Sequence, residues 1–206
     1  MTFAFKIMKG FFLKPCVEFA RQQLDPHFDV DEDVLRYPSM DLLLRVPGKS
    51  PILDGMFEQI LEKAGLQKII GPDIKIRDMN ARRMNGKFDN GLQWHTDGWF
   101  EHGVAIPLTD IPLGGPATGF KRNGRTYPAY CEAGDVYVFH NQIPHCRMRN
   151  WRRVKATVVL AGLFPTVESF TPGAIPWVPN LVSPHLRLLT NALRFEDEAY
   201  DWGESA

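Results

Sequence analysis

A histidine and an aspartate stand two residues apart in the segment QWHTDG, Gln93–Gly98. Along a β-strand, residues i and i+2 point to the same face, so the side chains of His95 and Asp97 can reach one metal ion. A third ligand is available fifty residues later in His145, at the start of another β-rich run. Two histidines and one carboxylate on one face of an iron(II) ion leave coordination positions open for substrates and dioxygen. The three residues therefore predict a reactive iron site.

Other interpretations of these residues are open. A His-x-Asp pair also occurs in surface turns and where a carboxylate orients a histidine. His140 is a rival third ligand; it shares strand parity with Val136 and Val138 and is equally interpreted as a core or rim histidine. The remaining histidines lack ligand spacing and are interpreted as exposed or packing residues, with His102 as a candidate to line a pocket beside the metal-binding segment.

The composition is that of a globular protein without charge bias. The 206 residues include 24 basic and 24 acidic ones, so the formal net charge is zero, and no broad electrostatic footprint for nucleic acid or an anionic membrane is expected. The sequence has no apolar run of about 18 residues, which argues against a membrane-spanning helix. The three cysteines share no close spacing and are interpreted as reduced thiols of a cytoplasmic protein.

Two helices are expected in the first part of the chain, over residues 15–24 and 51–64. For the second, Ser50 suits the N-cap, Pro51 the first helical position and Gly65 the C-terminal end. Apolar residues recur there every four positions, which predicts one buried face. This face is expected to consist of Ile52, Met56, Ile60 and Ala64.

From about residue 74 the pattern changes to short β-rich runs punctuated by Gly, Pro and Asn, which indicates a β-sandwich or barrel. The runs lie at residues 74–79, 103–110, 125–130, 135–140, 145–149 and 154–164. A last helix is expected after Pro184, in a proline-rich tail. The interpretation is a single mainly β domain. It has a helical N-terminal layer over about 1–72, a β core over about 73–165 and a C-terminal tail over 166–206.

Several motifs follow one another in the β-rich half. An apolar strand and a short acidic turn, IPLTDIPLGG, span Ile106–Gly115 and are followed by Thr118 and Phe120. Gly134 then opens an aromatic-containing strand eleven residues before His145. This order resembles the 2-oxoglutarate/Fe(II)-dependent oxygenase superfamily, most closely its prolyl-4-hydroxylase-like group.

The resemblance covers roughly residues 77–164, under half of the chain. The pair Phe139–His140 and Asn150 are also similar to the phytanoyl-CoA dioxygenase group, so the subfamily is open. The resemblance implies a double-stranded β-helix (jelly roll) core, with N-terminal helices packed on it and a short C-terminal helix. It also implies that Fe(II) is bound by His95, Asp97 and His145.

The resemblance further implies how 2-oxoglutarate binds. The keto-acid end of 2-oxoglutarate binds the iron, and a cation on the strand after the second histidine pairs with the distal carboxylate. Lys155 stands ten residues after His145, and Thr157 shares its face as a hydroxyl donor. Arg153 has the same parity and is the competing cation, while an exposed lysine on an edge strand is the alternative interpretation of Lys155. Two more candidates lie on an upstream strand that often contacts 2-oxoglutarate in relatives: Asn80 and Arg82.

Members of this superfamily use dioxygen to decarboxylate 2-oxoglutarate to succinate and CO₂ while they oxidise, usually hydroxylate, a substrate C–H bond, with ascorbate as a candidate reductant. Desaturation, cyclisation and epimerisation are alternatives on the same platform, and a cupin-type metal enzyme or a non-catalytic binding module are alternatives outside it. The expected partner is a small organic molecule, with no nucleic acid and no membrane. Arg147 and Arg149 share the parity of His145 and predict an anionic substrate, with two solvated arginines beyond the end of the strand as the alternative. Trp99 is a candidate pocket residue.

Overall fold

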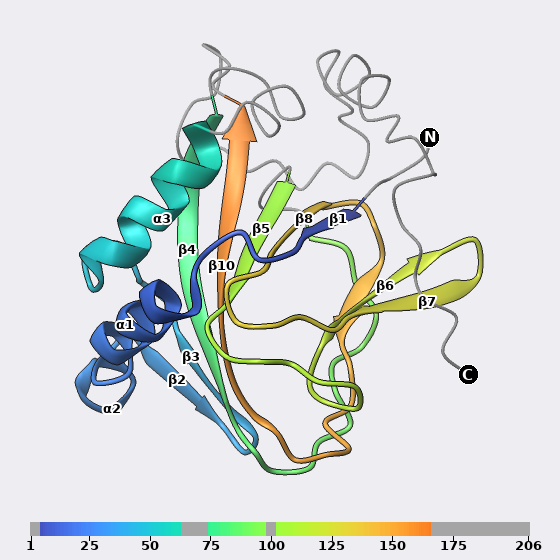
Figure 1. Cartoon of the computed structure of the whole chain (residues 1–206). Helices are drawn as coiled ribbons and strands as arrows, with labels where there is room; N and C mark the ends of the chain where they lie inside the picture. Colours follow the sequence, from blue (N-terminus) through green and yellow to red (C-terminus); the bar gives the residue numbers. More distant parts are fainter. Residues whose placement is uncertain (1–4, 63–73, 98–101, 166–206) are drawn as a thin grey trace.

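The computed structural model describes residues 5–62, 74–97 and 102–165, which form helices on one side and antiparallel strands on the other (Figure 1). The helices are α1 (Lys14–Leu24), α2 (His27–Val30) and α3 (Pro51–Glu62). The strands are β1 (Phe5–Met8), β2 (Val34–Tyr37), β3 (Met40–Leu43), β4 (Ile74–Asn85), β5 (His102–Pro107), β6 (Thr118–Arg122), β7 (Arg125–Ala129), β8 (Val136–His140), β9 (His145–Arg147) and β10 (Lys155–Pro165). In the described ranges, no helix is both long and apolar enough to cross a membrane.

The described strands form two antiparallel sheets. The larger sheet has seven strands in the order β1-β8-β5-β10-β4-β3-β2, and the smaller has three in the order β7-β6-β9. The expected helical layer therefore also contains strands, because β1 pairs with β8 and β3 pairs with β4. These N-terminal strands have four residues each, too few for a readable alternation of apolar and polar side chains. The mainly β fold with N-terminal helices is confirmed, whereas the expected C-terminal helix lies outside the described residues.

Helices α1 and α3 begin within one residue of their predicted starts, whereas the short α2 was not predicted. Helix α1 has proline in its first turn, and the side chains of α1 that face inward are fully buried. Helix α3 is capped as expected, since the Ser50 hydroxyl accepts a hydrogen bond of 3.2 Å from the Leu53 amide. The buried face of α3 is broader than predicted, because a 3.6-residue period brings Leu53 and Phe57 inward and leaves Ile52 half-buried. Ala64, the last expected member of this face, lies outside the described residues.

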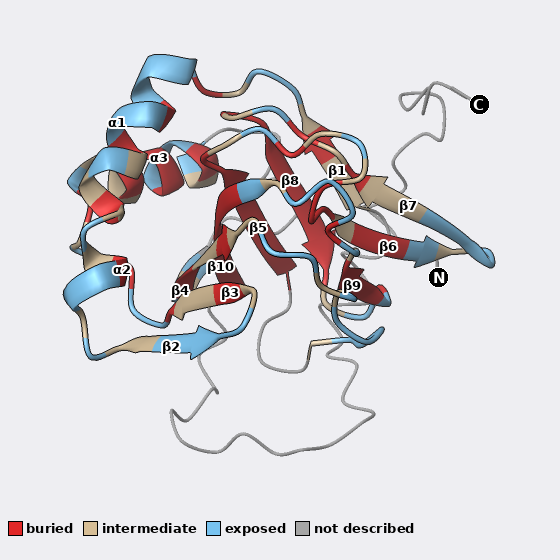
Figure 2. Ribbon diagram, turned by 90° about the horizontal axis from the view of Figure 1, so that it is seen from below, coloured by how far each residue is buried: buried red, intermediate tan, exposed pale blue. Residues whose placement is uncertain are grey.

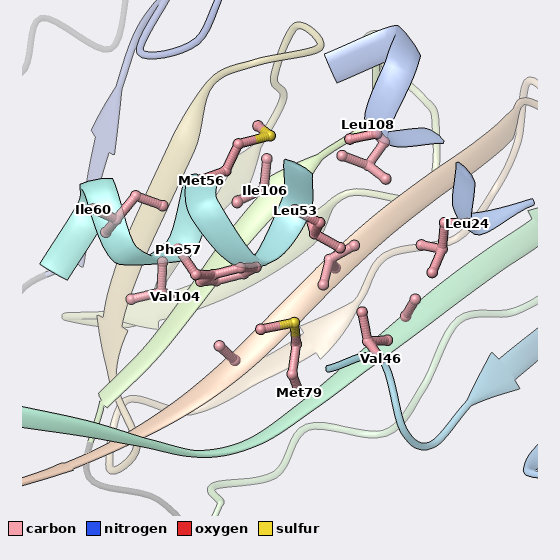
Figure 3. Packing of buried hydrophobic residues seen from close by; sticks show 14 of the residues in the cluster. Leu24, Val46, Leu53, Met56, Phe57, Ile60, Met79, Val104, Ile106 and Leu108 are labelled. Atoms are coloured by element: carbon pink, nitrogen blue, oxygen red, sulfur yellow. The ribbon is translucent and has the colours of Figure 1, made fainter. Parts of the chain in front are cut away.

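Helices α1 and α3 cover one face of the larger sheet, here called the outer face. Figure 3 shows Phe57 and Met56 of α3 lying over Val104 and Ile106 of β5. The outer face of β10 is formed by its odd-numbered apolar residues, which belong to the same buried cluster: Val159, Ala161 and Leu163. This packing fixes which side of each strand of the larger sheet points to the helices.

The opposite, inner face of the larger sheet points toward the smaller sheet. Ala156, Val158 and Leu160 of β10 lie in a second buried cluster with Tyr137 of β8 and Phe120 of β6. The strands of this region are buried over most of their length (Figure 2). The space between the two sheets is therefore where side chains from β4, β8, β9 and β10 converge.

Candidate metal centre

The segment that holds His95 and Asp97 is fastened to β9 and to the turn before it. The His95 amide donates to the His145 carbonyl at 3.0 Å, and the His145 amide donates to the His95 carbonyl at 2.9 Å. The Asp97 amide donates to the carbonyl of Asn141 at 3.2 Å. Apart from this single bridge the segment has no strand pairing, so the expected strand is an extended loop. The pairing of backbones nevertheless brings the three predicted ligands together.

The side chains of these three residues meet at one point. One ligand atom from each of His95, Asp97 and His145 lies within 4.8 Å of the other two. The Nε2 atom of His145 is 3.0 Å from Oδ2 of Asp97, and Nε2 of His95 is 4.0 Å from Oδ1 of Asp97. The His145 side chain is 7% exposed and that of His95 is 40% exposed, so the cluster lies between the interior and the surface.

Hydrogen bonds fix the tautomers of both imidazoles. Nδ1 of His95 donates to the carbonyl of Gln93 at 2.8 Å, and Nδ1 of His145 donates to the carbonyl of Ile143 at 2.9 Å. A carbonyl oxygen can only accept, so each neutral ring has its proton on Nδ1 and a lone pair on Nε2. The lone pair of His145 then faces the Asp97 carboxylate, an arrangement that requires a proton or a cation between the two. This donor set suits a divalent metal with nitrogen and oxygen ligands.

His140, the rival third ligand, points the other way. It shares the outer-face parity of Val136 and Val138, which belong to the cluster beneath the helices. Its ring packs perpendicular to that of His102, with centroids 5.0 Å apart, and both side chains are buried. Burial lowers the pKa of His140 to about 4, and burial together with the charge of His140 lowers the pKa of His102 to about 3. The expectation that His102 lines the metal pocket was therefore wrong, and both histidines are buried, neutral side chains away from the metal cluster.

A cavity between the sheets opens beside His145. Its wall includes Arg82 of β4, Arg147 of β9 and the hydroxyl-bearing residues Thr118 and Tyr137. The Thr118 and Tyr137 hydroxyls lie 2.9 Å apart in a hydrogen bond, and burial raises the pKa of Tyr137 to about 12. The remaining wall is mostly apolar: Met84, Ile111, Pro116, Phe139, Val158 and Leu160. The cavity thus combines an apolar wall with two guanidinium groups and a phenol.

The structure places Lys155, the predicted cation for 2-oxoglutarate, away from the cavity. Strand β10 begins at Lys155, which is exposed. The inner face of this strand is formed by its even-numbered residues, such as Val158. Thr157 points outward, and its amide donates to the Thr109 hydroxyl at 3.0 Å. Arg153 precedes the strand with a φ of 51° in an exposed turn. The predicted parity of Lys155 with Thr157 was right, but their shared face is the one that points away from the cavity.

Of the two upstream candidates, Arg82 reaches the cavity. Arg82 pairs with Val158 across β4 and β10, which places it on the inner face. Asn80 pairs with Leu160 on the same face and is buried, but it does not line the cavity. Among the described residues its side-chain oxygen has no hydrogen-bond partner.

Of the residues predicted to bind the substrate, one lines the cavity and another lies away from it. Arg147 lines the cavity beside His145, as its strand parity predicts, and its guanidinium lies 3.2 Å from the carboxylate of Asp89. Strand β9 ends at Arg147, so the parity does not extend to Arg149, which is exposed and lies over the ring of Trp151. Trp99 lies outside the described residues.

Sequence reasoning missed Asp89 and Tyr137 as parts of the site. Asp89 lies 58 residues before Arg147, and no local pattern predicts their ion pair. Strand β8, which carries Tyr137, is buried on both faces, so no alternation of apolar and polar residues marks the side on which its phenol lies.

Comparison with known proteins finds solved structures with a similar fold but no protein with a similar sequence. No protein-family model matches the chain, and no curated protein matches its sequence. Among solved structures, the non-haem 2-oxoglutarate-dependent carbocyclase SnoK from nogalamycin biosynthesis has a TM-score of 0.66 at 11% identity, over 77% of this chain and 78% of SnoK. The epimerase SnoN from the same biosynthesis has a TM-score of 0.63 at 15% identity, over 82% of this chain and 85% of SnoN.

A prolyl-4-hydroxylase from Pseudomonas putida is a third similar structure. It has a TM-score of 0.60 at 12% identity, over 81% of this chain and 95% of the hydroxylase. This chain has the fold of 2-oxoglutarate-dependent oxygenases. The jelly-roll core expected from the motifs is thereby confirmed, and the closeness of the three TM-scores leaves the subfamily open.

Proposed function

We propose that this chain is a 2-oxoglutarate- and Fe(II)-dependent oxygenase that oxidises a C–H bond of a small organic molecule. The observation that carries the proposal is the convergence of His95, Asp97 and His145 at the edge of a cavity lined by two arginines. A metal with open coordination positions and an adjacent anion site are the two elements that this chemistry needs.

The three residues fit Fe(II) in donor type and in protonation. Both imidazoles keep Nε2 available because their Nδ1 protons are bonded to backbone carbonyls, and Asp97 supplies an anionic oxygen. Iron(II) bound there supplies the activation of dioxygen that couples decarboxylation of 2-oxoglutarate, to succinate and CO₂, with oxidation of the substrate. The protein holds the ligands in place and surrounds the cavity with apolar side chains that keep water out.

Arg82 and Arg147 take the place of Lys155 as the cations for the distal carboxylate of 2-oxoglutarate. Burial lowers the pKa of Arg147; Asp89 raises it and Arg82 lowers it again, so the two guanidinium groups lie close enough to repel each other. Asp89 neutralises one of the two charges, which leaves a single net positive charge at the cavity. One carboxylate matches that charge, and a planar guanidinium is suited to bind it through two hydrogen bonds.

The outcome proposed first for the oxidised substrate is hydroxylation. An epimerase, a carbocyclase and a hydroxylase have this fold, so epimerisation and cyclisation are the alternative outcomes. SnoN has been crystallised with Fe³⁺, 2-oxoglutarate and nogalamycin RO, which supports a small organic molecule as the substrate here. The predicted anionic character of that substrate loses its basis, because Arg149 is away from the cavity and Arg147 is assigned to 2-oxoglutarate.

The proposal is tested by titration of 2-oxoglutarate into Fe(II)-loaded protein without oxygen, followed by measurement of succinate release in air. We expect Arg82→Leu to weaken 2-oxoglutarate binding by at least about tenfold, because hydrogen bonds between charged groups typically contribute about 1.5–3 kcal/mol and Arg82 is half-buried. Lys155→Leu is the matched control, since it removes a cation from the adjacent strand without touching the cavity. Loss of binding in Lys155→Leu with binding retained in Arg82→Leu would contradict the assignment.

A further inference from the structure

The turn that joins β8 to β9 is closed by a side chain. Within this turn the Ile143 amide donates to the His140 carbonyl at 3.1 Å. The Gln142 amide donates to Nδ1 of the His140 imidazole, also at 3.1 Å. The imidazole therefore bonds the backbone two residues ahead of itself, in the manner of an asparagine in an Asx-turn.

Two carbonyls of the same turn contact metal ligands. The Asn141 carbonyl accepts the Asp97 amide at 3.2 Å, and the Ile143 carbonyl accepts the Nδ1 proton of His145 at 2.9 Å. One contact fixes the backbone of the carboxylate ligand, and the other fixes the ring orientation and tautomer of the histidine ligand. The conformation of this turn therefore determines the positions of two of the three candidate ligands.

The surroundings of His140 suit it to this task and to no direct role at the metal. The side chain is almost fully buried on the outer face of the sheet, with the ring of His102 packed perpendicular to it. An amide can only donate, so Nδ1 of His140 must carry a lone pair. Because burial keeps the ring neutral, that lone pair persists at neutral pH.

We infer that His140 is a positioning residue for the metal centre: its imidazole holds the turn whose carbonyls orient Asp97 and His145. The inference rests on the proposed function, because it requires these residues to bind a metal. Removal of a group that orients a metal ligand typically weakens metal binding by about 10- to 100-fold. His140 does not contact the ligands itself but holds the turn whose carbonyls contact them. We therefore expect its removal to weaken metal binding by the lower end of that range, about tenfold.

The experiment is a titration with Co(II), which binds the same nitrogen and oxygen ligands and whose visible absorption reports its coordination geometry. His140→Leu keeps an apolar side chain but removes the acceptor, and we expect Co(II) affinity to fall about tenfold with a changed spectrum. His140→Asn restores an acceptor for the amide two residues ahead, and we expect nearly wild-type affinity and spectrum. His102→Leu is the matched control, since it removes the neighbouring buried imidazole, which makes no hydrogen bond within the described part of the chain.

The outcomes separate the two proposals. If wild-type protein binds no Co(II), or if His145→Ala binds it as well as wild type, the proposed function fails at its metal site. If wild type binds Co(II) through His145 and His140→Leu binds it equally well, the metal site stands and the role of His140 is overturned. Equal weakening in His102→Leu and His140→Leu would also overturn it, because packing alone would then explain the effect. If His140→Leu does not fold, His140→Phe takes its place with the same expectation.

Discussion

Protonation of the buried His102–His140 pair is expected to destabilise the protein in mild acid. The two rings pack against each other in the core, where burial lowers the pKa of His140 to about 4 and, with the charge of His140, that of His102 to about 3. An unfolded chain binds these protons at a pKa of about 6.5. The folded pKa values lie below the unfolded ones, so this stability is fully present above pH 6.5 and is lost as the pH falls toward 4.

The size of the effect follows from the difference between the solution pH and the pKa of histidine in the unfolded chain. At pH 5 the solution is about 1.5 units below the unfolded pKa and still above both folded values, so each histidine lowers the free energy of unfolding by about 2 kcal/mol. The pair together amounts to about 4 kcal/mol, out of roughly 5–15 kcal/mol for a typical domain. Most carboxylates are still ionised at pH 5, so their protonation adds little to the loss of stability between pH 7 and pH 5.

Urea unfolding of metal-free protein at pH 7 and pH 5 measures this loss. The double variant His102→Leu/His140→Asn removes both buried rings and serves as the reference, because all other titratable groups are common to the two proteins. We expect wild type to lose about 4 kcal/mol more than the double variant between the two pH values. The same loss in both proteins would refute the assignment of depressed pKa values to this pair.

Three further predictions concern the ligands, the loop before them and the core. His145→Ala is expected to abolish Co(II) binding and succinate release with little change in far-ultraviolet circular dichroism, and retained turnover would remove His145 from the ligand set. Gly91→Ala is expected to lower the unfolding free energy by about 1–3 kcal/mol and to weaken Co(II) binding, because Gly91 has a φ of 77° and an added Cβ would lie 2.3 Å from the Arg147 carbonyl; a change below this range in urea unfolding would contradict it. Phe57→Ala is expected to cost about 3–5 kcal/mol in the same assay, since Phe57 is fully buried under the helical layer, and a smaller loss would show that the layer repacks.

The ligands could be predicted from sequence because they depend on local order. His95 and Asp97 lie two residues apart, and the glycine-to-histidine spacing before His145, which resembles that of the oxygenase superfamily, indicated the third candidate ligand. The N-cap of α3 was predictable for the same reason, because Ser50 bonds an amide three residues ahead of it. Such features involve neighbours along the chain, and their geometry is set by the backbone itself.

Which cations line the cavity could be decided only from the tertiary structure. Parity along β10 was predictable, but the face that points inward was not, because residues 156–163 are buried on both sides and show no alternation of apolar and polar residues. A shift of one residue exchanges the faces, so the spacing from His145 that pointed to Lys155 could not show that Arg82 on the neighbouring strand reaches the cavity. The pairing of β4 with β10 decided this point.

Sequence by itself determined the class of fold, the starts of α1 and α3 and the three candidate metal ligands, since each follows from spacing within one segment or from motifs in a set order. Tertiary structure alone decided that His140 faces the helices, that Arg147 pairs with Asp89 and that Arg82 lies in the cavity. Each of these depends on which side of a strand is covered by which partner. That choice is made by the packing energy of the whole core, to which residues distant in sequence contribute together.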